Sequence, residues 1–251
     1  MKAINYHIKG IIETFEQLSK GRYLLYFIPS ILVTFIYAYF IWRAQEADQF
    51  FEIESKSDWA NFIFRALDNG VSFFVDIYRM LLEQIYIFVA LTLLSPVNTL
   101  LGEKLDERIS GKKTKGGVIR FINDLVRMIF VVVIALFFEL IFITFYWLIA
   151  SILGFPEIMN SIFYFVIAAF FFGFAFYDFA LERYAKGVFS SLGFAFSHPL
   201  GMIVLGSIFL AIYAIPWAGI LLAPVLCIMI STVAYLYYTK QHPKLKRPAH
   251  E

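Results

Sequence analysis

Leu94-Ser95-Pro96-Val97-Asn98-Thr99-Leu100-Leu101-Gly102-Glu103-Lys104-Leu105-Asp106-Glu107-Arg108-Ile109-Ser110-Gly111 is the stretch from which the fold can be worked out. It begins inside an apolar run and ends in a charged loop. Pro96 removes a backbone hydrogen-bond donor within the run, and the polar residues Asn98 and Thr99 follow it. Two interpretations fit this pattern: polar groups beside a backbone break line a passage for a polar solute, or a helix leaves the membrane here for water.

The composition indicates a polytopic membrane protein. The chain has 251 residues, of which 61% are hydrophobic and 16% charged, and its mean hydropathy is +0.74. Soluble domains are about half apolar and carry about a quarter charged residues. The single cysteine, Cys227, excludes a disulfide framework and a multi-cysteine metal site. Because the net charge is only +2 and no H-E-x-x-H, G-x-S-x-G or P-loop motif occurs, we expect no nucleic-acid partner, catalytic residues, cofactor or metal.

Apolar spacing predicts helices in the first half of the chain. Residues 1–22 are expected to form an amphipathic N-terminal helix and a turn, because the apolar residues between 3 and 18 recur at helical spacing. Residues 23–102 are expected to contain two long helices. The first, Tyr23 to Trp42, would be about 30 Å long, which is the thickness of the hydrocarbon core. The second is expected to begin near Val71.

Two helical hairpins are predicted in the second half. In residues 118–180, a surface helix leads into an apolar run that turns at Gly154-Phe155-Pro156-Glu157 and returns. In residues 186–238, an amphipathic piece precedes a second pair of apolar runs, of which Leu200 to Ile215 would measure only about 24 Å. The turn after it carries no charge, so this hairpin is expected to end inside the membrane, packed against protein. Residues 239–251 form a basic tail.

The basic residues predict the orientation in the membrane. They gather in the N-terminal segment, in residues 103–127, at Arg183 and Lys186, and in the C-terminal tail. All of these segments share one side if each run or hairpin returns the chain, and the positive-inside rule places that side in the cytoplasm. We therefore expect a multi-pass protein with cytoplasmic termini. Full spans and half-spanning hairpins predict the same orientation, so charge does not distinguish them.

Several motifs resemble those of one known family. Residues 95–111 resemble the "APFNGLLAEQLEARLTG" segment of the CysZ-like sulfate permeases. Phe176-Tyr177-Asp178-Phe179 is similar to the family's Tyr-Cys-Asp-Tyr-Pro region, with Ala180 in place of the proline. Residues 215–225, IPWAGILLAPV, resemble its "IPLLNLFIMPVAV" hairpin, and Phe27-Ile28-Pro29 matches the start of its first long helix. The order and spacing of the motifs agree along nearly the whole chain.

The resemblance implies a fold and a function. It implies an all-α integral membrane protein with two long transmembrane helices, two hemi-penetrating helical hairpins and amphipathic surface helices, forming one membrane domain over residues 1–251. It further implies homo-oligomers in the bacterial inner membrane that pass sulfate or a similar oxyanion inward for sulfur assimilation. The alternative is a non-transporting membrane protein of the same fold with an organising or lipid-interacting role.

The strongest candidate for an anion site is the turn Lys20-Gly21-Arg22. The family's sulfate-binding turn before the first long helix reads like Gly-Leu-Arg. Aligned on Ile28-Pro29, Gly21 matches, whereas the arginine positions hold Tyr23 and Leu24 and the basic residues flank the glycine. A glycine turn at a helix N-terminus offers free N–H groups to an oxyanion. In the alternative, the two cations anchor the chain to lipid phosphates.

Other polar residues are candidates for lining a passage. Asn98 and Thr99 either line it or satisfy carbonyl groups that the proline frees. Glu139 lies in the middle of an apolar run, where a charge is costly, and is either a protonatable group on the passage or a neutral or paired group bonded to a neighbouring helix. Elsewhere we expect Asp178 to pair with Arg183 at the membrane surface, and the scattered histidines to lie on the surface.

Overall fold

Every regular element that the structure describes is a helix. The computed structural model describes residues 2–48, 85, 87–111, 118–184, 186–216 and 218–243. Its helices are α1 (Lys2–Ser19), the 3-10 turn η1 (Leu24–Tyr26), α2 (Phe27–Asp48), a helix over residues 87–110, α4 (Val118–Leu153), α5 (Glu157–Glu182), α6 (Val188–Ser197), α7 (Pro199–Tyr213) and α8 (Gly219–Tyr238). The predicted all-α class is confirmed. The predicted start of the second long helix near residue 71 lies outside the described residues.

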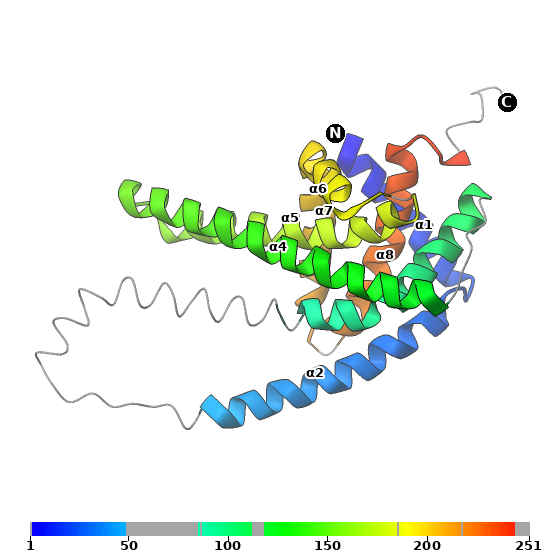
Figure 1. Ribbon diagram of the computed structural model, residues 1–251, viewed down its shortest axis with the longest axis horizontal. Coiled ribbons are helices and arrows are strands. Elements are labelled where there is room, and N and C mark those ends of the chain that lie inside the picture. Colours follow the sequence, from blue (N-terminus) through cyan, green and yellow to red (C-terminus); the bar gives the residue numbers. More distant parts are fainter. Residues whose placement is uncertain are drawn as a thin grey trace, which may run out of the picture.

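Helix α8 is the centre of the fold. The apolar window that makes α8 a candidate span is 83% buried, and α8 packs against α1, α2, α5 and α7. Figure 1 shows the start of α1 and the end of α8 at the same end of the molecule, and there the ring of Tyr6 stacks on Tyr237 with centroids 5.7 Å apart. Because other helices cover α8 on most sides, apolar residues occur all around it with little helical periodicity, as expected of a buried helix.

Glycines allow α5 and α7 to pack closely. A β carbon built on Gly173 would lie 2.0 Å from the carbonyl oxygen of Met202, and one on Gly206 would lie 1.7 Å from that of Ala169. Neither distance is sterically possible, so these two positions require glycine. Small residues at helix contacts are typical of membrane proteins, where close backbone approach replaces the hydrophobic driving force available in water.

Three described helices are long and apolar enough to cross a membrane. They are Ile122–Leu153, Glu157–Glu182 and Gly219–Tyr238. Helices α6 and α7 add a fourth candidate only as a bent pair, since they meet at an angle of 97°. Helix α7 has 15 residues and is therefore about 22 Å long, shorter than the roughly 30 Å hydrocarbon core.

Helices α4 and α5 form a long antiparallel hairpin that projects from the body of the molecule (Figure 1). The predicted surface helix and the apolar run after it are one continuous helix of 36 residues, α4. Gly154 closes this helix with a φ of +65°, and Pro156 precedes α5. Near the tip, Tyr146 stacks on Phe163 at 3.8 Å and donates a hydrogen bond of 2.8 Å to Asn160.

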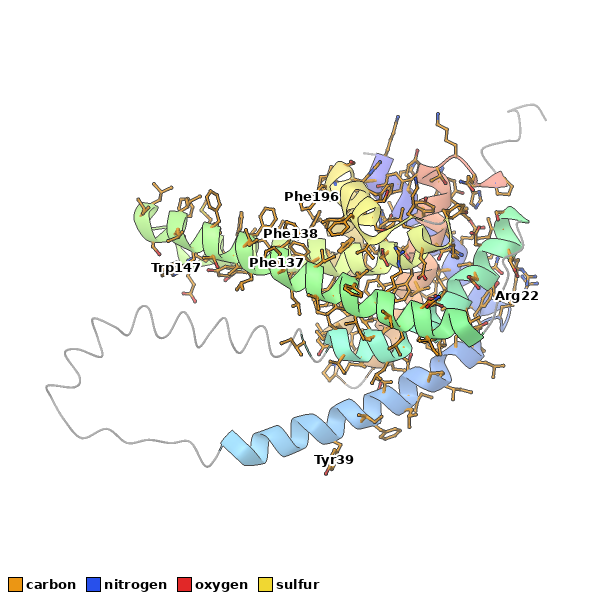
Figure 2. All side chains as sticks on the ribbon, in the orientation of Figure 1. Arg22, Tyr39, Phe137, Phe138, Trp147 and Phe196 are labelled. Carbon is orange, nitrogen blue, oxygen red and sulfur yellow. The ribbon has the colours of Figure 1, made fainter. Side chains whose placement is uncertain are left out.

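The outer surface of the described helices is largely apolar. Phe137 of α4 and Phe196 of α6, labelled in Figure 2, are 59% and 43% exposed. Helix α1 shares this character, since Ile8 and Ile12 are 48% and 62% exposed. An apolar exterior on a helical body is the pattern expected of a protein whose surroundings are lipid.

Candidate functional site

The helix over residues 87–110 carries a stripe of buried polar residues on the face that points to the protein interior. The polar stripe consists of Ser95, Asn98, Thr99, Glu103 and Asp106, which recur at spacings of three and four and so share one face of the helix. None is more than 7% exposed. The predicted candidates Asn98 and Thr99 are therefore inside the protein, where the Asn98 amide nitrogen and the Thr99 hydroxyl have no hydrogen-bond partner among the described residues.

Arg183 meets the polar stripe from the end of α5. Its Nη1 donates to the carbonyl oxygen of Gly102 and lies 3.4 Å from Oδ2 of Asp106. The Tyr184 hydroxyl donates to the same carboxylate oxygen at 3.0 Å. A β carbon on Gly102 would lie 3.3 Å from the Thr232 hydroxyl, so glycine allows the polar stripe to approach α8 and Arg183 closely.

The guanidinium of Arg183 is incompletely paired. Its side chain is 2% exposed, and within the described part of the chain Nε and Nη2 have no hydrogen-bond acceptor. Burial lowers the pKa of Arg183 below its ordinary value, and the nearby Asp106 carboxylate opposes this effect without cancelling it. Burial, together with Asp106, also raises the pKa of Tyr184, so its hydroxyl remains a donor at neutral pH. A buried cation with unused donors is a site where an acceptor ligand would be stabilised.

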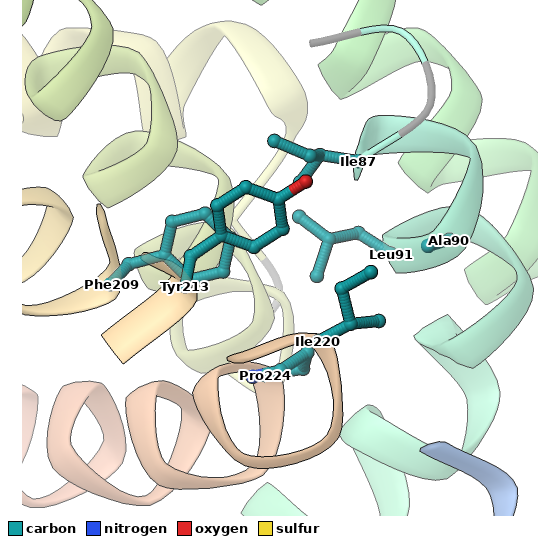
Figure 3. A pocket seen from close by; sticks show the side chains of 7 residues that line it. All are labelled: Ile87, Ala90, Leu91, Phe209, Tyr213, Ile220 and Pro224. Atoms are coloured by element: carbon teal, nitrogen blue, oxygen red, sulfur yellow. The ribbon is translucent and has the colours of Figure 1, made fainter. Parts of the chain in front are cut away.

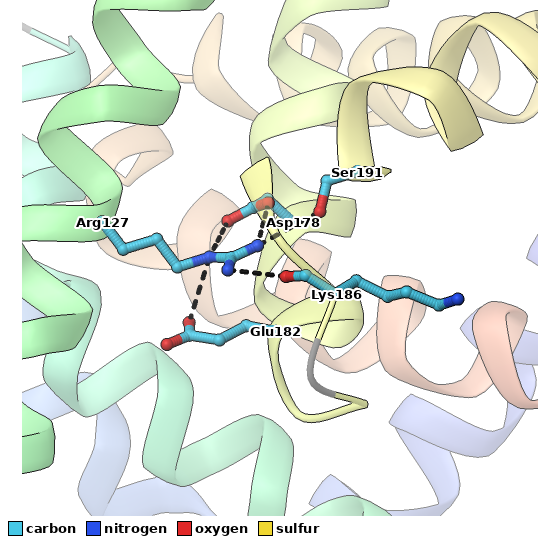
Figure 4. Close-up of polar contacts among 5 residues, drawn as sticks. All are labelled: Arg127, Asp178, Glu182, Lys186 and Ser191. Atoms are coloured by element: carbon cyan, nitrogen blue, oxygen red, sulfur yellow. Dashed lines mark hydrogen bonds and ion pairs between the residues drawn. The ribbon is translucent and has the colours of Figure 1, made fainter. Parts of the chain in front are cut away.

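A second arginine joins α4 to α5 and α6 (Figure 4). Arg127 donates to both carboxylate oxygens of Asp178, at 2.9 and 2.7 Å, and also to the Lys186 carbonyl at 2.7 Å and the Ser191 hydroxyl at 3.1 Å. Oε2 of Glu182 lies 3.8 Å from Nε. The two parallel N–H groups of the guanidinium match the two carboxylate oxygens, and most of the Arg127 donors already have an acceptor. We therefore assign this cluster a role in holding the helices together.

The predicted pair between Asp178 and Arg183 is wrong. Asp178 pairs with Arg127, and Arg183 pairs with Asp106. Residues five apart on a helix are rotated by about 140° around its axis, so these two side chains leave α5 on different sides. Each then finds a partner on another helix, which local spacing does not reveal.

The Lys20-Gly21-Arg22 turn ends α1. The Gly21 amide donates to the Leu18 carbonyl at 2.9 Å, and the Arg22 amide donates to the Gln17 carbonyl at 3.3 Å. With the Gly21 φ of +70°, these bonds form a Schellman cap. The two amides expected to be free for an oxyanion are therefore bonded to α1.

Both cations of this turn have local partners. Lys20 lies 2.5 Å from Glu16, and the pair is about half exposed. Arg22 donates to the side chain of Gln17 at 3.1 Å and lies at the outer edge of the molecule in Figure 2. The structure thus keeps the turn at the periphery, while Arg183 and the polar stripe are in the interior.

Glu139 is buried in the hairpin. It is 1% exposed and lies on the inward row of α4 with Ala135 and Ile143, which faces α5. Along the α4 axis it is about 18 Å from Arg127, since each residue adds 1.5 Å. Glu139 therefore belongs to the α4–α5 contact and is well removed from the Arg127 cluster.

Two histidines predicted to lie on the surface are buried. His7 donates from Nδ1 to the Ala3 carbonyl at 2.8 Å, and the Tyr177 hydroxyl contacts Nε2 at 2.9 Å. Burial lowers the pKa of His7, which favours a neutral ring that accepts the Tyr177 hydrogen bond. His242 lies 3.1 Å from Glu13 and stacks on the ring of Tyr237.

The prediction for these histidines fails because α1 turns its polar face inward. His7, Glu13, Thr14 and Gln17 of α1 are each less than a tenth exposed, whereas the isoleucines on the opposite face are at the surface. The helical spacing of these polar residues opposite an isoleucine row was the signal available in the sequence.

Two cavities lined by described residues do not reach the polar stripe. One, of about 10 Å³, is lined by apolar side chains such as Leu91, Phe209 and Ile220 together with Tyr213 (Figure 3). It holds a single water at most. The other, of about 310 Å³, is an apolar groove between the 87–110 helix and α4.

No protein-family model matches the sequence, and no curated protein matches it. The fold and the site therefore define the class of protein. In the part of the chain that the structure describes, it is an all-helical protein with three helices long and apolar enough to span a membrane, and its interior contains paired and partly paired charges.

Proposed function

We propose that this protein is a membrane permease or channel for a small oxyanion, and that sulfate uptake for sulfur assimilation is the specific activity to test first. The resemblance of residues 95–111 to the CysZ-like permeases supports this proposal. The single observation that carries it is Arg183, a buried cation with unused donors beside the polar stripe. The proposal includes the bacterial inner membrane as location and cytoplasmic termini, on the distribution of basic residues.

The polar stripe supplies a physical basis for passage. Charged and polar groups inside a membrane protein are expensive, and they mark ion and substrate routes. From Ser95 to Asp106 the polar stripe extends about 16 Å along its helix, about half of the hydrocarbon thickness. Hydroxyl, amide and guanidinium donors over such a distance would replace part of the water that an oxyanion loses on entering.

The proposal includes a specific membrane arrangement. We propose that α7 and α8 form a half-spanning hairpin, because α7 is about 22 Å long and the turn after it, residues 214–218, carries no charge. Helices α4 and α5 would form the other hairpin, and residues 23–102 the two long helices. Turns held at membrane depth require a protein cover, and so we propose a homo-oligomer.

One observation favours the alternative, a non-transporting protein that organises the membrane or binds lipid. Among the described residues, six carboxylates are at most 7% exposed, whereas the arginines that pair with two of them are Arg183, whose side chain is 2% exposed, and Arg127, whose side chain is 16% exposed. The six are Glu13, Glu103, Asp106, Asp124, Glu139 and Asp178. Ionised carboxylates in a low dielectric repel a dianion. An excess of buried carboxylates along a route therefore favours the non-transporting alternative.

Uptake by the reconstituted full-length protein separates the two functions. Radiolabelled sulfate and phosphate are offered to proteoliposomes, with protein-free vesicles and an unrelated helical membrane protein as controls. The permease proposal predicts saturable uptake of at least one oxyanion above both controls. Uptake that equals the controls for both anions would reject transport and leave the organising role.

A further inference from the structure

The ion pair of Arg183 and Asp106 carries both unused donors and an unused acceptor. Nε and Nη2 of Arg183 have no acceptor within the described residues, and Oδ1 of Asp106 has no donor there. The two side chains are 2% and 9% exposed. Because the unused atoms belong to groups already in contact at 3.4 Å, a single small molecule can meet atoms of both kinds.

Two neighbours fix the orientation of the pair. The Gly102 carbonyl accepts from Nη1 of Arg183, and the Tyr184 hydroxyl donates to Oδ2 of Asp106. These bonds leave Nη2 and Nε on one group and Oδ1 on the other. The absence of a β carbon at Gly102 keeps the backbone, the Thr232 hydroxyl and the guanidinium close together. The recognition atoms are therefore preorganised rather than mobile.

The chemistry of this pair distinguishes two kinds of oxyanion. Sulfate is fully deprotonated at neutral pH, so all of its oxygens accept hydrogen bonds and none donates. Hydrogen phosphate has the same tetrahedral shape but keeps a hydroxyl group, which donates to a carboxylate while its other oxygens accept from a guanidinium. Against sulfate, the Asp106 carboxylate offers only repulsion and a buried acceptor without a donor.

We infer that the Arg183–Asp106 pair is a binding site for an oxyanion that carries a proton, represented by inorganic phosphate, and that it selects this class over sulfate. The inference rests on the proposed passage of an oxyanion, and it names a protonated oxyanion in place of sulfate as the preferred substrate class. Arg183 supplies positive charge and two donors, and Asp106 accepts the hydrogen of the anion. Selectivity comes from the carboxylate, because the arginine alone would bind both anions.

The expected preference is large enough to measure. Phosphate forms a hydrogen bond with the charged Asp106, whereas sulfate meets repulsion there. This difference corresponds to about 10–100-fold tighter binding of phosphate. Asp106→Asn removes the charge but keeps an oxygen that accepts from Tyr184. We expect it to weaken phosphate binding, strengthen sulfate binding and reduce the preference at least tenfold. Arg183→Gln should abolish binding of both anions.

The test measures equilibrium binding of phosphate and sulfate to the purified full-length protein at neutral pH. Glu107→Gln is the matched control, because it neutralises an adjacent carboxylate that lies outside the polar stripe and pairs with Lys104 at the surface. This control should keep the wild-type preference. Tyr184→Phe is a second test of Asp106 should Asp106→Asn fail to fold, since it frees the carboxylate from its orienting bond and should lower the preference.

The outcomes separate this inference from the proposed function. Equal or tighter binding of sulfate by the wild type, or an unchanged preference in both Asp106→Asn and Tyr184→Phe, overturns the inference and leaves an oxyanion permease standing. Binding of neither anion, together with no uptake, overturns both. Phosphate preference that falls in Asp106→Asn and persists in Glu107→Gln supports the site.

Discussion

Replacing Arg127 by alanine should destabilise the protein strongly. Asp178 is 2% exposed, and in the wild type its carboxylate accepts two hydrogen bonds from Arg127. Without the arginine, a buried carboxylate loses its cation, and the Lys186 carbonyl and the Ser191 hydroxyl lose a donor. Removing one partner of a buried ion pair lowers the free energy of unfolding by about 3–5 kcal/mol. We expect a loss in this range.

The assay is reversible unfolding in mixed micelles, followed by circular dichroism. Lys104→Ala is the control, because its ion pair with Glu107 is exposed and such pairs contribute about 0–1 kcal/mol. Adding Asp178→Asn to Arg127→Ala removes the uncompensated charge, so the double variant should lose less than the sum of the two single variants. A loss below about 0.5 kcal/mol for Arg127→Ala, or strict additivity, would refute the assigned role.

Three further predictions concern packing, pH and topology. Gly206→Ala places a β carbon 1.7 Å from the Ala169 carbonyl oxygen and should cost at least about 1–3 kcal/mol in the same unfolding assay. Gly193→Ala should be neutral or slightly stabilising, because no atom beyond its chain neighbours and its own helix backbone lies within 4 Å of the new carbon. Burial lowers the pKa of His7 in the folded state, so the stability that neutral His7 contributes is complete above its unfolded pKa and is lost as the pH falls below about 6.5. In His7→Gln, the free energy of unfolding should therefore decrease less between pH 7.5 and pH 5 than it does in the wild type. In the proposed half-spanning arrangement, Ala214→Cys should resist a membrane-impermeant maleimide added to either side, with little background because Cys227 is buried. Labelling from either side would contradict that arrangement.

Much of the helical framework could be predicted from local patterns. The N-terminal helix, the turn at Gly154 and the short α7 follow from apolar runs, their lengths and their breakers, which act within a few residues of chain. Boundaries were less accurate where no breaker occurs. Helix α4 continues from Val118 through the predicted surface helix, because no glycine or proline interrupts it before Gly154.

The candidate site was only partly predictable. Asn98 and Thr99 could be singled out because polar residues in an apolar run are conspicuous, and both are buried. Arg183 could not be recognised as a partner of Gly102 and Asp106 on the same helix, since it follows Gly102 by 81 positions. The Lys20-Gly21-Arg22 turn reads equally well as an anion cradle or a helix cap, and only the bonded partners of its amides distinguish the two.

The sequence by itself determined the membrane class, the helical content and the positions of the turns, because hydropathy, apolar run length and helix breakers depend on residues that are close together in the chain. The tertiary structure alone decided which charges pair. It joined Arg127 to Asp178 and Arg183 to Asp106, and it turned the polar face of α1 inward. A buried ion pair depends on which helix faces bury one another, and that choice is made by packing over the whole chain.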